Sequence, residues 1–239
     1  MMSTYSKDEI IKKLEVAKSE MWKFYSQDFV NYRGKTSDKE RYYYTEIIAK
    51  WLLDNIELFN DIKMISRENS YKVDSHDGKI KNEKSGREEE IIAMKLFDFS
   101  QNQGKVFDII GKIIDYQTPL KDIQTDKAGK IDLLAYNENE KTLRILELKK
   151  PDSKETMLRC VLEAYTYLKV VDKAKLLKDF GLPENTKIKA CPFVFFGGEQ
   201  HKEMKEIKDS RKNLEKLIEK LGVEVIYLKE ENGEYSIIK

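Results

Sequence analysis

Asp132, Glu147 and Lys149 are the residues of this chain whose types and spacing could do chemistry together. Two carboxylates that converge on one point can hold a divalent cation, and Mg²⁺ prefers oxygen ligands of this kind. A neighbouring ammonium group can stabilise the negative charge that develops on a phosphoryl group. If the fold brings these side chains together, they predict a site for metal-assisted hydrolysis of a phosphodiester.

The stretch that would bring these side chains together, residues 129–150, reads GKIDLLAYNENEKTLRILELKK. It predicts two strands joined by a polar turn, Lys130–Tyr136 and Leu143–Lys149. With residues 138–141 as the loop, Asp132 lies directly opposite Glu147, and strand alternation places Lys149 on the same face. This face is apolar towards the turn and charged at its far end. Isolated charges there would be costly, so we expect them to be paired or to hold a metal.

The arrangement resembles the PD-(D/E)XK nuclease superfamily, whose members share the restriction-endonuclease-like fold. The matching residues are Asp132 on the first strand, and Glu147 and Lys149 on the second. The resemblance covers roughly residues 87–226, and Ile131 stands where the family name has a proline. It implies an α/β fold with an αβββαβ core, in which a mixed sheet is flanked by helices.

The resemblance also implies roles for individual residues. In similar nucleases the carbonyl between the second acid and the lysine joins the two acids as a metal ligand. Asp132, Glu147 and the Leu148 backbone carbonyl would therefore hold Mg²⁺ or Mn²⁺. Lys149 would orient the attacking water and stabilise the charge of the transition state. The alternative is an Asp–Lys–Glu salt-bridge cluster in an inactive member of the superfamily.

Members of the superfamily often add an acid from the first core helix, and residues 87–90 read REEE. Helical spacing puts Glu88 and Glu89 one turn before the apolar Ile92, whereas Glu90 faces more outward. We therefore expect Glu89, and after it Glu88, to be the further catalytic acid. An acidic first turn that complements the helix dipole is the alternative explanation.

Arg159, Glu163 and Tyr167 follow one another at helical spacing in the second core helix. In relatives an Arg, Gln or Tyr at this place points into the active site, and Glu163 stands where a Gln is expected. The resemblance thus implies that these side chains, with Gln117 after the first core strand, surround the metal ligands. An ordinary ion pair between Arg159 and Glu163 is the alternative.

The chain divides into a helical N-terminal region packed on the core (1–65), a polar linker (66–86) and the nuclease-like domain (87–239). In the N-terminal region, a capping box at Ser6 opens a predicted helix over 7–25, and a second box at Ser37 opens one to about residue 62. The tyrosines at 42–44 could stack on bases, although their helical spacing favours a place in the core.

Periodicity and chain breakers predict the elements of the core in order. They are a helix over 87–99, strands over 112–116, 130–136 and 143–149, a helix capped by Asp152 and running to 172, a short helix over 174–180, a strand over 187–196, a helix over 200–221 and a strand over 223–228. This order agrees with the core that the resemblance implies.

Composition restricts the partners only weakly. The 44 Lys and Arg residues nearly balance the 43 Asp and Glu residues, so a nucleic acid would need a local basic groove. Cys160 and Cys191 form no CxxC pair and are expected to be reduced and buried. His76 and His201 are too few and too far apart for a zinc site and are expected at the surface. No signal-peptide or membrane-spanning run is visible, which favours a cytoplasmic protein without a membrane partner.

The leading hypothesis is a Mg²⁺- or Mn²⁺-dependent nuclease that hydrolyses phosphodiester bonds, with DNA as the expected substrate. A homodimer is compatible with this hypothesis. The first alternative is an inactive nuclease-fold protein that binds nucleic acid or another protein. The second is a structural protein in which the charged cluster only fixes the fold. Metal binding separates the leading hypothesis from both alternatives, and salt-dependent DNA binding separates the alternatives from each other.

Overall fold

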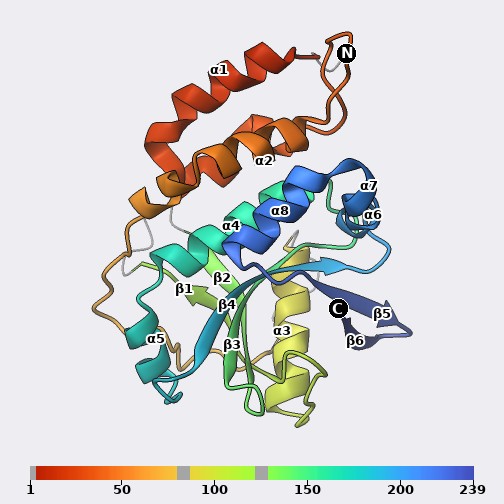
Figure 1. The fold of residues 1–239 in the computed structure, drawn as a ribbon. Coiled ribbons are helices and arrows are strands. Elements are labelled where there is room, and N and C mark those ends of the chain that lie inside the picture. Colours follow the sequence, from red (N-terminus) through yellow and green to blue (C-terminus); the bar gives the residue numbers. More distant parts are fainter. Residues whose placement is uncertain (1–3, 80–86, 122–128) are drawn as a thin grey trace.

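A computed structural model describes residues 4–79, 87–121 and 129–239. The chain has an α/β fold around one six-stranded mixed sheet, with its strands in the order β1 to β6 (Figure 1). The strands are β1 (Lys112–Pro119), β2 (Lys130–Asn137), β3 (Thr142–Leu148), β4 (Lys187–Phe195), β5 (Ile226–Glu231) and β6 (Glu234–Ile238). Strand β4 runs parallel to both of its neighbours, β3 and β5, and the other adjacent pairs are antiparallel.

Helices precede, connect and cover these strands. In the N-terminal region they are α1 (Lys7–Ala17), the 3₁₀ helices η1 (Lys18–Ser26) and η2 (Asp28–Asn31), α2 (Tyr44–Asp54) and the 3₁₀ helix η3 (Ile56–Asp61). In the remainder they are α3 (Glu88–Gln101), α4 (Met157–Val170), α5 (Lys173–Asp179), α6 (Glu199–Lys205), α7 (Ile207–Ser210) and α8 (Lys212–Leu221). No helix of the described residues is both long and apolar enough to cross a membrane.

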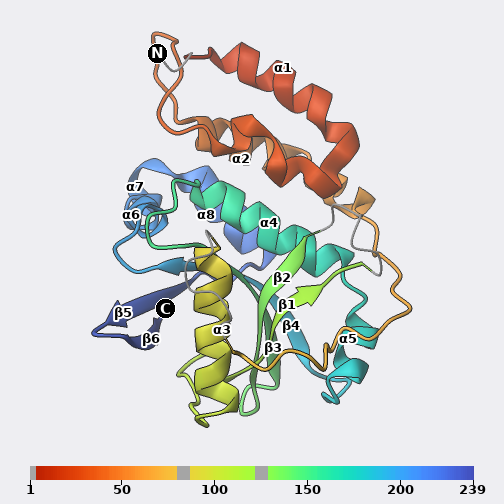
Figure 2. The ribbon, with the colours of Figure 1, turned by 180° about the vertical axis from the view of Figure 1, so that it is seen from behind.

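The sheet separates two apolar clusters. On one face, buried residues of α3 and of all six strands form one cluster, in which α3 lies on β1 and β2. On the other face, α4 and α8 cover the sheet, and α1, η1 and α2 form a further layer on them (Figures 1 and 2). Buried residues of the N-terminal helices, such as Leu14 and Ile48, belong to the same cluster as Leu162 of α4. The N-terminal region therefore completes the core on this face.

The hairpin of β2 and β3 has the predicted register. Leu133 pairs with Leu146 and Asn137 with Thr142, so residues 138–141 form the loop as expected. Alternation also holds, because Leu133 packs on the α3 face whereas Leu134 packs on the α4 face. The same register carried one step further places Asp132 opposite Glu147.

Two helix starts differ from the prediction. The helix expected from Ser37 begins at Tyr44, because the preceding loop is used to hold α1: Asp38 accepts a hydrogen bond from the Lys7 amide, and the Ser37 amide donates to Tyr5. The helix expected from Asp152 begins at Met157 after a Thr156 cap. The Ser6 capping box is confirmed, but α1 ends at Ala17 and continues as the kinked η1.

The C-terminal part holds two further differences. The single helix expected over 200–221 is divided into α6, α7 and α8, and the last strand is followed by β6, which was not predicted. The turn before β6 is Asn232-Gly233, with positive φ at both residues. This dipeptide is the strongest short hairpin signal, so β6 was readable from the sequence. Residues 67–79 contain no helix or strand, as expected for the linker, and residues 80–86 lie outside the described residues.

The histidines are less exposed than expected, because His201 is buried and His76 is partly buried. The His201 ring is buried beside Phe196 and Tyr227, and its Nδ1 accepts the Gly197 amide. His76 Nδ1 lies 2.7 Å from Oδ1 of Asp115. Cys160 and Cys191 are buried and unpaired, which confirms that part of the prediction.

Candidate active site

Asp132 is held at the point where β2 and β3 part. The Leu148 amide donates to Asp132 Oδ2 at 2.9 Å, in the place where the continued ladder would offer the Ile131 carbonyl. Gln117 Nε2 donates to Asp132 Oδ1 at 3.0 Å. Gln117 lies within β1, with a positive φ of 49°, rather than after the strand as predicted. Both carboxylate oxygens of Asp132 are therefore fixed by neighbouring strands.

Lys149 is surrounded by carboxylates. Its ammonium lies 2.8 Å from Glu163 Oε2, 3.0 Å from Glu147 Oε1 and 3.2 Å from Glu155 Oε2. Glu147 and Glu163 accept hydrogen bonds from the ammonium, whereas Glu155 is within ion-pairing distance only. Glu147 and Lys149 are each only 5% exposed. The ion pair between them confirms that they share one face of the strand.

Glu89 of α3 reaches the end of β3, as expected, because its Oε1 accepts the Lys150 amide at 3.0 Å. Glu88 does not point inward. Its side chain is 57% exposed and pairs with Lys150 Nζ at 3.2 Å, whereas the Glu90 side chain is 34% exposed. The prediction that Glu90 faces more outward than Glu88 is therefore wrong. The first helical residue has no preceding turn to cover it, which explains the exposure of Glu88.

Helix α4 contributes side chains to the site. Glu163 pairs with Lys149, so the alternative of an Arg159–Glu163 pair is wrong; Arg159 instead lies 3.0 Å from Glu155. Tyr167 is buried, and its hydroxyl approaches Gly129 so closely that a Cβ there would be 2.1 Å away. Gly129 thus lets α4 come close to the start of β2.

The acids of the site have strongly shifted pKa values. Burial raises the pKa of Asp132 to about 7, against the attraction of Lys149 and with a further rise from Glu89 and Glu163. Burial also raises the pKa of Glu147 well above its ordinary value, and the charge of Asp132 adds to this. Burial alone would lower the pKa of Lys149, but Glu147 and Glu163 hold it well above its usual range. Lys149 therefore keeps its charge at neutral pH, while both acids bind a proton more tightly than free carboxyl groups do.

The polar groups here are incompletely satisfied. Among the described residues, five buried side-chain atoms have no hydrogen-bond partner, and three of them belong to this site: Glu147 Oε2, Glu155 Oε2 and Arg159 Nε. The last two are within ion-pairing distance of a neighbour but lack hydrogen-bond geometry. Buried polar groups are normally paired, so their concentration at one place indicates a site that binds a further group.

The donor set fits a hard divalent cation only if ligands from outside the protein complete it. No group of three or more His, Cys, Asp or Glu side chains within the described residues is arranged to hold a metal ion. Mg²⁺ is usually bound by one or two carboxylates, with water and substrate phosphate in its other positions. Asp132 and the free Oε2 of Glu147 meet that need, and the Leu148 backbone lies beside Asp132.

Two residues near the site were not predicted. Glu155 falls within the helix predicted after Asp152, but it precedes α4 and pairs with Lys149 and Arg159. Tyr25 of η1 contacts Tyr167, and its hydroxyl is hydrogen-bonded to that of Tyr167. A contact between the N-terminal region and α4 leaves no periodic signal in the sequence, so only the structure shows it.

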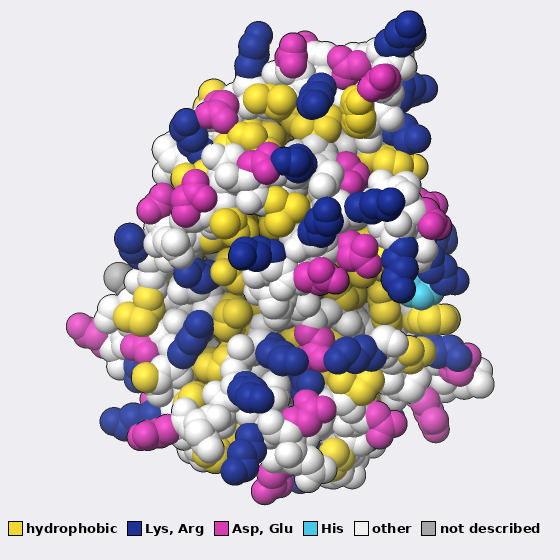
Figure 3. Space-filling view, in the orientation of Figure 1, with side chains coloured by type: hydrophobic (Ala, Val, Ile, Leu, Met, Phe, Trp, Pro, Cys, Tyr) yellow, Lys and Arg dark blue, Asp and Glu magenta, His cyan; other side chains and the backbone are white. Residues whose placement is uncertain are grey.

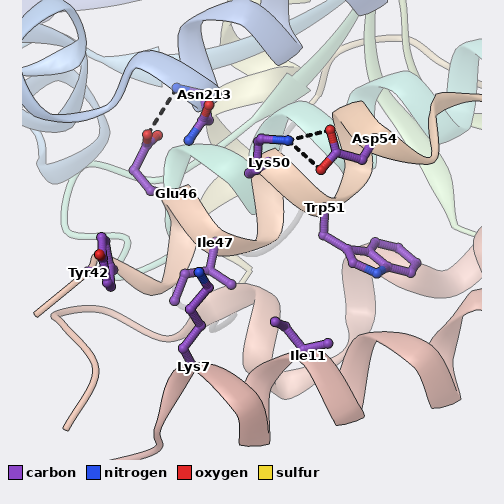
Figure 4. Close-up of a pocket in the computed structure, with 9 residues that line it drawn as sticks. All are labelled: Lys7, Ile11, Tyr42, Glu46, Ile47, Lys50, Trp51, Asp54 and Asn213. Atoms are coloured by element: carbon purple, nitrogen blue, oxygen red, sulfur yellow. Dashed lines mark hydrogen bonds and ion pairs between the residues drawn. The ribbon is translucent and has the colours of Figure 1, made fainter. Parts of the chain in front are cut away.

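A well-formed hollow of about 390 Å³ lies elsewhere, between α1, α2 and the start of α8 (Figure 4). Its charged groups already have partners, because Lys50 pairs with Asp54 and Glu46 accepts the Asn213 amide. The face of the molecule in Figure 3 shows basic and acidic side chains interspersed. Neither feature competes with the acids around Lys149 as a chemical site.

Comparison with known proteins does not identify a family for this chain. No protein-family model, curated protein or solved structure matches this chain. The argument for function therefore depends on the residues of the site and on the fold that holds them.

Proposed function

We propose that this protein is a metal-dependent nuclease that hydrolyses phosphodiester bonds, with DNA as the expected substrate, on a PD-(D/E)XK-like core. One observation carries the proposal. Asp132 and Glu147 occupy opposite positions when the register of the β2–β3 hairpin is continued by one residue, and Glu147, which pairs with Lys149, keeps one oxygen without a hydrogen-bond partner. The surrounding Glu155, Glu163 and Glu89 give the site more carboxylates than cations, and such a surplus favours binding of a further cation.

In this proposal, Asp132, Glu147 and the Leu148 carbonyl would hold Mg²⁺ or Mn²⁺. The ion would supply a Lewis acid for the phosphoryl oxygens and an activated water. Gln117 and the Leu148 amide orient Asp132 through its two oxygens. Lys149 presents a fixed positive charge to the phosphate, and Glu163 holds the lysine in place from α4. Glu89 links the start of α3 to the strand end that carries these groups.

The test combines cleavage with metal binding. Purified protein should cut DNA only with Mg²⁺ or Mn²⁺, and Mn²⁺ should raise its melting temperature. Asp132→Asn should stay folded, lose cleavage and lose most of that thermal shift. An equal metal-induced shift in the wild type and the variant would reveal a non-specific ion effect and remove the support for this site.

A specific observation favours the second candidate, an inactive nuclease-fold protein that binds a partner. Lys149 donates hydrogen bonds to Glu147 and Glu163 and lies within ion-pairing distance of Glu155, so its charge is already compensated without a metal. If the cluster is architectural, the wild type should cut no nucleic acid with any divalent ion. Salt-dependent DNA binding without cleavage would then identify a binding module.

A further inference from the structure

The η1 segment carries Tyr25 to the candidate site, and Trp22 precedes it by three residues. In a 3₁₀ helix, residues three positions apart share a face. Met21 and Phe24 are both 2% exposed and pack into the core. Trp22 and Tyr25 have the same spacing, so a regular 3₁₀ turn would place them on one adjacent aromatic face. The backbone between them is non-helical at Lys23.

Tyr25 forms the inner end of this aromatic face. Its ring meets that of Tyr167 edge to face, with the centroids 6.1 Å apart. Burial raises the pKa of Tyr25, and the charges of Glu163 and Glu147 raise it further. The tyrosine therefore stands beside the acids of the site while keeping part of its own surface accessible.

Trp22 forms the outer end. It is 47% exposed, and the ammonium of Lys23 lies 5.4 Å from the centre of its ring. The same ammonium, which lies over the ring, also pairs with Glu20 at 2.6 Å. A single exposed aromatic residue is ordinary on a protein surface. Three features together match one strand of nucleic acid. The exposed indole would stack on a base, the cation would contact a phosphate, and the acid site would act on the bond to be cut.

The depth of the site restricts the form of that strand. Glu147 and Lys149 are nearly inaccessible, and Asp132 is the partly accessible member of the three. A duplex is a wide rod whose bases are already stacked inside it, so it offers neither a narrow backbone nor a free ring face. An unpaired strand offers both, and its bases stack readily on aromatic side chains.

We infer that Trp22 and Tyr25 form a stacking platform for unpaired bases and that the protein takes single-stranded DNA as its substrate. This inference extends the proposed nuclease function, but its binding test does not require cleavage. The ammonium of Lys23 would contact the phosphate next to the stacked base. The platform would guide the backbone from Trp22 past Tyr25 towards Asp132.

The binding test uses fluorescein-labelled oligothymidylate, and the same strand annealed to oligodeoxyadenylate, in a metal-free buffer. Fluorescence anisotropy should show tighter binding of the single strand. Trp22→Ala should weaken that binding about five- to 100-fold, the range for loss of one stacked base, whereas Trp22→Phe should retain most of it. Tyr42→Ala is the matched control, because Tyr42 is 41% exposed but lies in the hollow between α1 and α2. Unchanged binding by Trp22→Ala, or equal binding of the duplex, would overturn the inference.

The cleavage arm repeats the comparison with Mn²⁺. Preferential cutting of the single strand, lost in parallel with binding in Trp22→Ala, supports both proposals. Equal cutting of both substrates would overturn the stacking inference and keep the nuclease. Selective, Trp22-dependent binding without any cutting by the wild type would remove the nuclease proposal and leave the stacking platform standing.

Discussion

At Lys149, one ammonium group separates two buried carboxylates, Glu147 and Glu163, and the partly exposed Glu155, so its removal should be costly. Lys149→Met keeps the aliphatic stem and deletes the charge. In metal-free buffer we expect the free energy of unfolding to fall by about 3–5 kcal/mol, the usual result of leaving a buried ionic group uncompensated. Denaturant titration measures this change. Lys150→Met is the matched control, because Lys150 is 40% exposed and its ion pairs should contribute under about 1 kcal/mol.

Lys149→Met also shows whether Lys149 takes part in catalysis or only stabilises the fold. If Lys149 stabilises the transition state, its loss should also lower the cleavage rate by orders of magnitude, as a well-placed electrostatic contact is worth about 3–4 kcal/mol. Excess Mg²⁺ should then restore part of the stability, since a cation can neutralise Asp132 and Glu147, but it should not restore the rate. Recovery of full cleavage in the folded variant would exclude a catalytic lysine.

Asp132 predicts a pH dependence with a definite sign. Its pKa is about 7 in the folded protein against an ordinary 3.8, so the folded state binds the proton more tightly than the unfolded chain. This contribution to stability is present at low pH and is lost as the pH rises through that window. Metal-free wild type should therefore lose more stability than Asp132→Asn between about pH 4 and pH 7. Parallel unfolding curves for the two proteins over that range would contradict the prediction.

Metal binding should show the opposite trend, because a cation and a proton compete for the same oxygens. The rise in melting temperature that Mn²⁺ causes should grow as the pH increases through the pKa of Asp132. The difference between the wild type and Asp132→Asn at each pH isolates the contribution of this carboxylate.

At the scale of elements, the hairpin was predictable and the helix ends were not. Turn formers and strict alternation determined the register of β2 and β3, and a register fixes which side chains meet. Helix starts depend on contacts that are distant in sequence. Glu203 accepts the Met157 amide at the start of α4, and Glu46 accepts the Leu214 amide at the start of α8. A carboxylate from another element gives no local signal, and Asp152 was assigned as the cap of α4 in place of Thr156. Ser37 was assigned as a cap although its loop instead holds α1.

The candidate site divides in the same way. Asp132, Glu147, Lys149 and Glu89 were found because strand parity and helical spacing place them. Glu155 and Tyr25 were missed, because a loop and a layer from the N-terminal region bring them to the site. Which acids contact Lys149 is a property of the packing of α4 on the sheet, which periodicity alone does not determine.

Thr156 shows how strongly one element can depend on another. Its hydroxyl accepts the Arg159 amide and donates to the Val30 carbonyl at 2.9 Å, which ties α4 to η2. Thr156→Ala should lower the free energy of unfolding by about 1–2 kcal/mol through loss of the cap and of this bond. Thr156→Ser keeps the hydroxyl and should recover most of the loss. Equal destabilisation by both substitutions would show that the methyl group matters more than the cap.

For the whole molecule, the question is whether residues 1–65 form part of one cooperative unit. Leu52 of α2 and Leu162 of α4 belong to one apolar cluster, and the Ile65 amide donates to the Val170 carbonyl at 2.7 Å. Removing residues 1–65 would expose the outer faces of α4 and α8. We therefore expect a 66–239 fragment to be insoluble or partly unfolded. A stable fragment with a cooperative transition would instead mark the N-terminal region as a detachable recognition domain.

Two core substitutions test the same point in the full chain. Leu52 in α2 and Leu96 in α3 are both fully buried, on opposite faces of the sheet. Either leucine replaced by alanine should lower the free energy of unfolding by about 2–5 kcal/mol. If the layers unfold together, both variants should shift a single transition that is the same by circular dichroism and by tryptophan fluorescence. The fluorescence reports on Trp22 and Trp51, which both lie in the N-terminal region. If the N-terminal layer unfolds alone, Leu52→Ala should move only the fluorescence transition, because the sheet and α3 would keep their own stability.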